Sequence, residues 1–361
     1  MKKRILGAIL LAVFVVLLTD GFAHAGIWNS FIYSYDDWTI TNLGTLPEGY
    51  QTVVYQGAIN NCGQAVGYVE GINFQSAFLW TDGVMTDLGA LTGSTSSIAK
   101  GINDNGQVVG IADHNAFLYS DGVITMLGSQ QGWFRSTAVD INNNGQVVGN
   151  AQGYGGFIYS GGVMTQLDVP ESHGFVPQSI NNNGQVVGYA NLLSGPTTAF
   201  LYSDGEMISL AQPGWTMSHA TSINDSGQVV GTYWNGSGDG FRAFLYSDGE
   251  MIDLGRLFGE STYANDINDE GQVVGMSKDL NNQYHPYLWS GGVMVDLGIH
   301  PQSHYTEAMG INDNGQILIR AQLPGDAPVI PSPPSVPLPP TVILFGTGLL
   351  NLAIWRRFRK G

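Results

Sequence analysis

Residues 102–110 read Ile-Asn-Asp-Asn-Gly-Gln-Val-Val-Gly, and this stretch decides the fold because variants of it recur along the whole chain. The block Ile-Asn-x-x-Gly-Gln occurs seven times at intervals of 39 to 44 residues, with a mean of 42. An apolar pair follows each Gln, and the last copy departs by ending in Ile317-Leu318-Ile319 instead of Gly. Self-similarity at such a period is typical of repeat architectures. The repeated glycines are Gly63, Gly106, Gly145, Gly184, Gly227, Gly271 and Gly315.

A second repeated block lies between the copies of the first. Residues 116–128 read Ala-Phe-Leu-Tyr-Ser-Asp-Gly-Val-Ile-Thr-Met-Leu-Gly. A more divergent copy occupies residues 31–44. In the first block the Gly is constant between two β-prone runs, and the residue before it is Asn in four copies and Cys62, Ser226 or Glu270 in the others. In the second block an Asp-Gly or Gly-Gly pair occupies the same place. Gly adopts positive φ without cost and Asn tolerates it, so both blocks are interpreted as β-hairpins with the same kind of turn. Other equivalents of the second block begin at Ala77, Gly156, Ala199, Ala243 and Pro286.

Two hairpins per repeat predict four short antiparallel strands in each unit of about 42 residues. That is the size and content of a propeller blade. The predicted fold is therefore all-β, a seven-bladed β-propeller over residues 26–321, with an N-terminal signal helix and a C-terminal hydrophobic helix. A β-solenoid is the alternative, but two tight turns per repeat favour a meander over a coil.

The order of the hairpins predicts how the ring closes. The chain begins with a copy of the second hairpin, at residues 31–44, and ends with a copy of the first, at residues 305–321. We expect these two hairpins to share a blade, because closure would cover the strand edges that an open meander exposes. The alternative phasing has complete blades from residues 31–67 onward, without a shared blade. Hydrogen bonding between the first and last hairpins distinguishes the two.

The repeat resembles the bacterial extracellular HAF repeat family, through the Ile-Asn-x-x-Gly-Gln-x-x-Gly block and the Ala-Phe-Leu-Tyr block. The resemblance covers about 290 residues. The His that names the family's repeat is missing before Ala-Phe, and where His285 occurs, Pro286-Tyr287 follow it. The resemblance carries no catalytic residue over to this chain. The residues that stand in place of the His are Ser76, Asn115, Thr198 and Arg242.

The N-terminus has the three parts of a secretory signal peptide. Basic residues 2–4 precede an apolar run over residues 5–18, and Ala-His-Ala, with Ala23 and Ala25, forms a cleavage site. We expect residues 1–25 to be removed and the chain to be exported across the inner membrane. An uncleaved anchor helix is the alternative, although the apolar run is short for a full membrane span.

The C-terminus has the features of a second targeting signal. Residues 322–340 are rich in Pro and form an extended linker, because Pro cannot donate to a helix or sheet. Residues 341–361 hold an apolar segment followed by a basic tail. As a helix the apolar segment falls short of the roughly 30 Å hydrocarbon core, which suits transient anchoring in the inner membrane. The basic tail would stay in the cytoplasm.

This tail resembles the PEP-CTERM sorting signal, whose motif is Val-Pro-Glu-Pro. The resemblance rests on Val336-Pro337-Leu338-Pro339, the apolar helix and Arg356-Arg357, with Leu338 where Glu is usual. It implies processing by an exosortase, a membrane cysteine transpeptidase of Gram-negative bacteria that make exopolysaccharide. It also implies a location at the cell surface or outside the cell. An ordinary C-terminal anchor is the alternative.

Composition excludes several classes of protein. The formal net charge is −16, and seven of the 13 basic residues lie at the two termini. A body so acidic cannot neutralise phosphates, which excludes nucleic acid as a partner and disfavours attachment to anionic lipid. Cys62 is the single cysteine, so the chain forms no intrachain disulfide and no multi-cysteine metal site.

A meander with two tight turns per blade places those turns on one rim and the longer, variable connections on the other. Variable loops on a repeated scaffold commonly form the binding face. We expect this face to bind an extracellular polysaccharide or a surface protein. The variable connections carry several Trp and Tyr residues. The alternative is that many of these aromatic side chains only cover blade edges. The candidate ligand-binding residues are Trp133, Trp215, Tyr233, Trp234 and Tyr263.

No catalytic or metal site is predicted. The sequence lacks a Gly-x-Ser-x-Gly nucleophile motif, a His-Glu-x-x-His metal motif and a phosphate-binding loop. Acids recur at matching positions of the turns, which indicates a scaffold, because catalysis needs one special constellation. No cofactor is expected, although Ca²⁺ on the acidic rim stays open. The sequence thus favours a non-enzymatic binding or structural role in the extracellular matrix. A secreted hydrolase acting on polysaccharide is the alternative, and acids clustered among the variable loops would favour it. The turn acids are Asp104, Asp225, Asp269 and Asp313.

Overall fold

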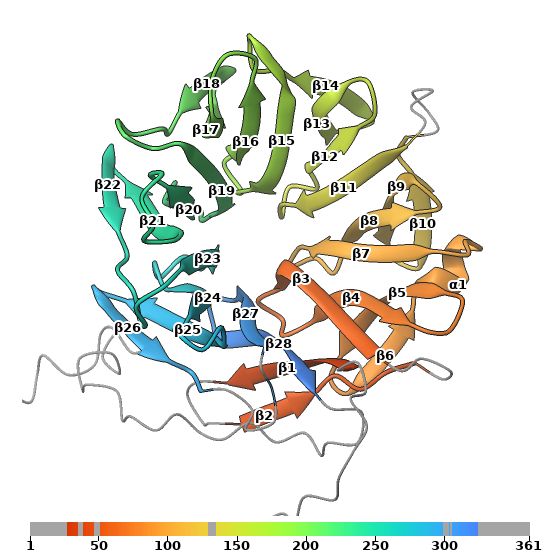
Figure 1. Cartoon of the computed structure of the whole chain (residues 1–361). Coiled ribbons are helices and arrows are strands. Elements are labelled where there is room, and N and C mark those ends of the chain that lie inside the picture. The colour runs from red at the N-terminus through yellow and green to blue at the C-terminus, as the bar shows by residue number, and fades with distance from the viewer. Residues whose placement is uncertain are drawn as a thin grey trace, which may run out of the picture.

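The computed structural model describes residues 27–34, 39–46, 51–128, 135–298, 303 and 305–323. Short antiparallel sheets surround a central axis in these ranges, in a propeller-like arrangement (Figure 1). The predicted signal peptide, anchor helix and nearly all of the linker lie outside the described residues. Within the described ranges, no helix is long and apolar enough to cross a membrane. One short helix, α1 (Gly89–Thr92), lies in the connection between two sheets.

Five sheets have four strands each, and the strands of each sheet follow one another along the chain. The first strand of each sheet lies nearest the axis and the fourth lies at the periphery (Figure 1). The first sheet holds β3 (Gln51–Ile59), β4 (Ala65–Glu70), β5 (Gln75–Thr81) and β6 (Val84–Asp87). The second holds β7 (Ser97–Ile102), β8 (Val108–Ala112), β9 (Asn115–Ser120) and β10 (Val123–Met126). The third holds β11 (Ser136–Ile141), β12 (Val147–Ala151), β13 (Gly155–Ser160) and β14 (Val163–Leu167). The fourth holds β15 (Ser172–Ile180), β16 (Val186–Leu192), β17 (Thr197–Ser203) and β18 (Glu206–Ser209). The fifth holds β19 (Met217–Ile223), β20 (Val229–Trp234), β21 (Arg242–Ser247) and β22 (Glu250–Asp253).

The remaining eight strands form one sheet that joins two four-stranded groups. A single parallel pair, Tyr284 with Tyr305, connects the groups. The first group holds β23 (Thr262–Ile267), β24 (Val273–Lys278), β25 (Tyr284–Ser290) and β26 (Val293–Asp296). The second holds β27 (Tyr305–Ile311), β28 (Gln316–Leu323), β1 (Ile27–Ser34) and β2 (Thr39–Asn42).

The two ends of the described chain meet in that second group. Strand β1 pairs antiparallel with β28 over eight residue pairs, with Ile32 opposite Leu318. The prediction that the first and last hairpins are hydrogen-bonded neighbours is therefore confirmed. The alternative phasing, without a shared group of strands, is wrong. Phe31 and Ile317 are 1% and 0% exposed, so this closure buries large apolar side chains.

The two repeated hairpins do not have the same kind of turn, contrary to the sequence-based expectation. In the second block, Asp121 and Gly122 both adopt positive φ, +50° and +81°, as a two-residue hairpin turn requires. In the first block Gly106 has φ +72°, while the residue before it does not adopt positive φ. There the Gly106 N–H donates to the Asn103 carbonyl at 3.0 Å, which closes a longer turn. Variation before this Gly is tolerated for that reason.

The Val-Val-Gly segment of the first block is explained by packing within each sheet. Val108 and Val109 are fully buried on the two faces of β8. A Cβ on Gly110 would lie 2.0 Å from the Ile98 carbonyl oxygen and 2.9 Å from the Phe117 ring. The Phe of the second block therefore packs over a strand position at which only Gly fits. The same crowding recurs at Gly67, Gly149, Gly188, Gly231 and Gly275.

Candidate functional site

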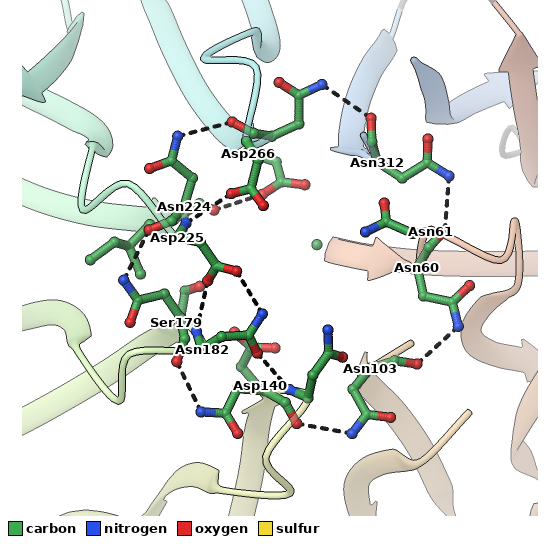
Figure 2. Close-up of a pocket in the computed structure, with 18 of the residues that line it drawn as sticks. Asn60, Asn61, Asn103, Asp140, Ser179, Asn182, Asn224, Asp225, Asp266 and Asn312 are labelled. Atoms are coloured by element: carbon green, nitrogen blue, oxygen red, sulfur yellow. Dashed lines mark hydrogen bonds between the residues drawn. The ribbon is translucent and has the colours of Figure 1, made fainter. Parts of the chain in front are cut away.

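The rim with the tight turns carries a closed ring of asparagine side chains around the axis (Figure 2). In every copy of the first block, an Asn follows Ile. Its side-chain amide donates a hydrogen bond to the backbone carbonyl of the corresponding Asn in the next copy. Asn60, for example, donates to the Asn103 carbonyl at 2.9 Å, and Asn312 donates to the Asn60 carbonyl at 2.8 Å. All seven are 3–4% exposed. The ring runs through Asn60, Asn103, Asn142, Asn181, Asn224, Asn268 and Asn312.

A second ring lies one residue further along each turn. Here the side-chain oxygen of each Asp or Asn accepts the backbone N–H of the preceding copy. Asn61 N–H donates to Asp104 Oδ1 at 2.8 Å, and Asp313 N–H donates back to Asn61 Oδ1 at 2.8 Å. Both Asp and Asn can accept here, which explains why either is found. The ring runs through Asn61, Asp104, Asn143, Asn182, Asp225, Asp269 and Asp313.

These two rings line the mouth of a central channel of about 170 Å³. The four turn carboxylates are therefore held in place by hydrogen bonds from the backbone. Asp104 also accepts hydrogen bonds from the Asn61 and Asn143 side chains, at 3.2 and 2.9 Å. Burial and the neighbouring Asp313, Asp225 and Asp104 raise the pKa of Asp269. The acids predicted to be scaffold residues thus take part in joining one copy to the next.

Two further carboxyls, Asp140 and Asp266, line the channel beneath the rings (Figure 2). Asp140 accepts the backbone N–H of Ile180 at 2.9 Å, and Asp266 accepts that of Ile311 at 2.9 Å. Ser222 donates to Asp266 at 2.6 Å. Burial raises the pKa of Asp140 to about 6 and that of Asp266 to about 7, and the neighbouring Asp140 charge adds to the second shift. Sequence reasoning did not single out these two positions.

The described residues offer little for a metal ion. Within those ranges no group of three or more His, Cys, Asp or Glu side chains is arranged to hold one. Ca²⁺ on the acidic rim stays a prediction. Cys62 is exposed, and its thiol lies 3.7 Å from the Asp104 carbonyl oxygen. In four other copies an Asn side chain donates to the matching carbonyl from this turn position.

On the opposite rim, two of the predicted ligand residues pack against the fifth sheet. Trp215 stacks on Tyr233 with ring centroids 4.1 Å apart and an interplanar angle of 10°. Tyr233 is 8% exposed, and its hydroxyl donates to Asp253 at 2.9 Å. Trp215 also lies 5.4 Å from the Phe244 ring. The Tyr233 ring therefore belongs to the edge of the core and presents little surface to a ligand.

An ion pair fixes the same region. The Arg242 guanidinium donates to Asp253 at 3.0 Å and lies 3.6 Å from Asp239. Hydrogen bonds from Gly255, Arg242 and Tyr233 outweigh burial and lower the pKa of Asp253. Burial and the Asp253 contact raise the pKa of Tyr233. Asp253 therefore stays ionised as a structural partner of Arg242 and Tyr233.

The other two described candidates, Trp234 and Tyr263, belong to a row of aromatic rings that crosses from the fifth sheet to the next. Trp234 lies 6.3 Å from Phe241, and Phe241 lies 5.4 Å from Tyr263, measured between ring centroids. Trp234 is 37% exposed, and its indole N–H donates to the Ser237 carbonyl at 3.0 Å. We call Trp234, Phe241 and Tyr263 the aromatic row. Phe241 was not among the predicted ligand residues, although it lies in the variable connection between β20 and β21.

Several predicted site residues lie outside the described residues. These are Trp133, the signal cleavage residues Ala23 and Ala25, and the sorting residues Val336, Pro337, Leu338, Pro339, Arg356 and Arg357. Of the five candidate ligand residues, the structure therefore brings Trp234 and Tyr263 together in one row, joined by Phe241. Trp215 and Tyr233 stack on each other instead.

Comparison with known proteins adds similarity of fold. No family model and no curated protein matches the chain. Among solved structures, TolB from Acinetobacter baumannii has a TM-score of 0.42 and 10% identity, covering 63% of this chain and 62% of that one. The chain thus spans less than two thirds of that TolB. A TolB-like protein from Agrobacterium tumefaciens has a TM-score of 0.47 and 10% identity, covering 83% and 100%. The BP39L lectin from Burkholderia pseudomallei has a TM-score of 0.40 and 12% identity, covering 75% and 95%. Likenesses of this size define no shared function, and the strand pairing of the chain itself establishes its propeller-like fold.

Proposed function

We propose that this protein is an exported, envelope-sorted, non-enzymatic β-propeller with a binding or structural role in the extracellular matrix or exopolysaccharide layer. The observation that carries the proposal is that the two rims differ in which residues they use and in what those residues contact. One rim uses the repeated residues for ring bonds between neighbouring copies. The other carries connections that differ from copy to copy, and the aromatic row lies at the strand ends and in one connection of this rim.

We assign seven blades to this propeller. The single pair between Tyr284 and Tyr305 is a contact between neighbouring blades, so the eight-stranded sheet counts as two blades of four strands. Seven is also the number of Asn residues in the closed hydrogen-bond ring. The shared blade, β27-β28-β1-β2, joins both ends of the described domain, and β1 covers the edge of β28.

The position of the carboxylates supports a role without catalysis. A hydrolase of the propeller type needs a pair of acids free to face a substrate. The turn acids instead accept backbone N–H groups of the preceding copy, as Asp225 accepts that of Asn182 at 2.8 Å. Asp140 and Asp266 accept backbone N–H groups inside the channel.

Export and sorting complete the proposal. The secretory signal of residues 1–25 and the resemblance of Val336-Pro337-Leu338-Pro339 to the PEP-CTERM motif support processing by an exosortase-type enzyme. The processed protein would leave its transient anchor in the inner membrane of a Gram-negative bacterium for the cell surface or the matrix. Membership of the HAF-repeat family belongs to the same proposal.

Binding to matrix isolated from the producing cells tests this function. The full chain should sediment with the matrix, and the combined change Trp133→Ala, Trp215→Ala and Trp234→Ala should weaken that binding. Val123→Ala is the matched control, because Val123 is 63% exposed on an outer strand. A native chain that does not bind matrix would contradict the proposal. Matrix binding unaltered by the triple change would remove the aromatic residues as its basis.

A further inference from the structure

A pocket of about 410 Å³ opens between the third and fourth sheets, on the rim opposite the tight turns. It is lined by the end of β12, the connection to β13, and the beginning of β15. This volume lies within the roughly 300–1,000 Å³ of small-molecule sites. None of the residues predicted as ligand-binding lines it.

The pocket lies at a junction that departs from the repeat. Each inner strand has one residue paired with the conserved Gly, or with Ile319 in the last copy. Two residues before it, six of the seven inner strands carry a small hydroxyl residue, whereas β15 carries Phe175. At three junctions this hydroxyl accepts the backbone N–H of the Ala that begins the neighbouring second block, as Ser136 does from Ala116 at 3.0 Å. The hydroxyl residues are Thr52, Ser97, Ser136, Ser218, Thr262 and Thr306.

The partner across the junction departs as well. Gly156 stands where Ala begins the second block in most copies, and a Cβ there would lie 2.8 Å from the Phe175 carbonyl oxygen. Gly155 and Gly174 face each other across the junction, and a Cβ on Gly174 would make an ordinary van der Waals contact with Gly155 Cα at 3.7 Å. A register shift between Ser172 and Phe175 marks a β-bulge where β15 begins. Bulges of this kind commonly occur beside binding sites.

The polar side chains at the pocket are all exposed, and they differ in their bonding within the chain. Gln166 donates to the Tyr154 carbonyl. The Asp168 carboxylate and the His173 imidazole make no hydrogen bond or ion pair within the described part of the chain. Asn191 accepts a hydrogen bond from Thr197 at 2.7 Å. The Tyr154 side chain is 47% exposed. The polar lining comprises Gln152, Tyr154, Gln166, Asp168, His173 and Asn191.

We propose that this pocket binds an uncharged saccharide unit of a polysaccharide. Amide and carboxylate side chains pair with hydroxyl groups, which are both donors and acceptors, and an exposed aromatic ring offers an apolar face. Among the lining residues that the structure describes, none is Lys or Arg, so an anionic ligand finds no counter-charge. Asp168 is the only carboxyl among them, which leaves no second acid for glycoside hydrolysis. The inference rests on the proposed function, because it names the ligand class of the variable rim.

The test is titration of the full chain, in mild detergent, with neutral oligosaccharides of glucose, galactose, mannose and N-acetylglucosamine, followed by calorimetry. At least one neutral oligosaccharide should bind, and Tyr154→Ala and Asp168→Asn should each weaken binding about tenfold or more. Ile72→Ala, which truncates an exposed apolar side chain in the β4–β5 connection, should leave this binding unchanged. Melting temperatures of the variants within about 2 °C of the native chain show that the fold is intact.

Three results would overturn the inference. They are a lack of binding across the neutral panel, tighter binding of an oligoglucuronate than of any neutral sugar, and neutral-sugar binding that survives the Tyr154→Ala, Asp168→Asn double change. Matrix sedimentation separates this failure from that of the proposed function. A chain that still binds matrix with both pocket changes loses the pocket as its site but keeps the role. A native chain that binds no matrix loses the role itself.

Discussion

The side-chain amide of Asn312 donates to the backbone carbonyl of Asn60 at 2.8 Å, across 252 residues of sequence. The same bond joins each earlier copy to the next over 39 to 44 residues. The long-range bond thus repeats the local one and turns a linear series of repeats into a ring. Each Asn also orders its own turn, as Asn142 Oδ1 accepts the N–H groups of Asn144 and Gln146.

Replacement of one ring Asn should therefore destabilise the fold. Asn142→Ala removes the buried bond to the Asn181 carbonyl, and it leaves the part-buried N–H groups of Asn144 and Gln146 without the Oδ1 acceptor. We expect a loss of about 2–4 kcal/mol in the free energy of unfolding. Asn144→Ala, in the same turn, removes one exposed hydrogen bond and should cost about 0.5 kcal/mol. Urea denaturation of the two variants makes the comparison, and equal losses would argue against the ring.

Closure by β1 and β2 predicts that the N-terminal strands hold the last repeat in place. Deletion of residues 27–46 would expose the edge of β28 and the apolar residues that β1 covers, such as Leu318. Unpaired edges of this kind promote association. We expect the deletion variant to melt at a lower temperature and to oligomerise in gel filtration. A monomeric variant with native stability would contradict closure by shared strands.

The glycine of the Val-Val-Gly segment gives a test of packing within a sheet. Gly110→Ala places a Cβ 2.0 Å from a backbone oxygen, so we expect a cost of about 1–3 kcal/mol or more. Gly238→Ala is the matched control, because a Cβ there meets nothing within 4 Å. Thermal melting compares the two. Similar melting temperatures would show that β8 can move away from its neighbours.

The channel carboxyls predict how stability depends on pH. Burial raises the pKa of Asp140 to about 6 and of Asp266 to about 7, whereas an unfolded Asp has a pKa near 3.9. Between about pH 4 and pH 7 the folded chain thus binds more protons than the unfolded chain, so the free energy of unfolding falls as pH rises. The Asp140→Asn, Asp266→Asn variant should show a flatter pH profile of unfolding. An unchanged slope would exclude these two groups as its source.

Sequence reasoning predicted the architecture because the repeat itself carries the information. The Gly that is constant at position 106 and its equivalents predicted the hairpins. The order of the hairpins predicted the pairing of β1 with β28. It did not predict the Asn ring, because the bond from Asn60 to Asn103 depends on how neighbouring sheets are placed. The signal was present, since Asn after Ile is as constant as the Gly.

The candidate site was harder to predict for the opposite reason. Binding residues on a repeat scaffold are departures from the pattern, and a single departure such as Phe175 has no copy to compare with. Aromatic type alone did not separate Trp234, which is 37% exposed, from Tyr233, which is 8% exposed. That difference follows from the alternation of side chains along β20, where the two residues point to opposite faces.

Intact mass of the native protein in each fraction of its producing cells tests the central claim most directly. The account predicts a chain that begins at Gly26, ends near Pro339 and is recovered from the cell surface or the matrix. A chain that retains Arg356-Arg357 in the inner membrane would contradict sorting and release. It would place the propeller in the periplasm as an anchored domain, with a different set of partners.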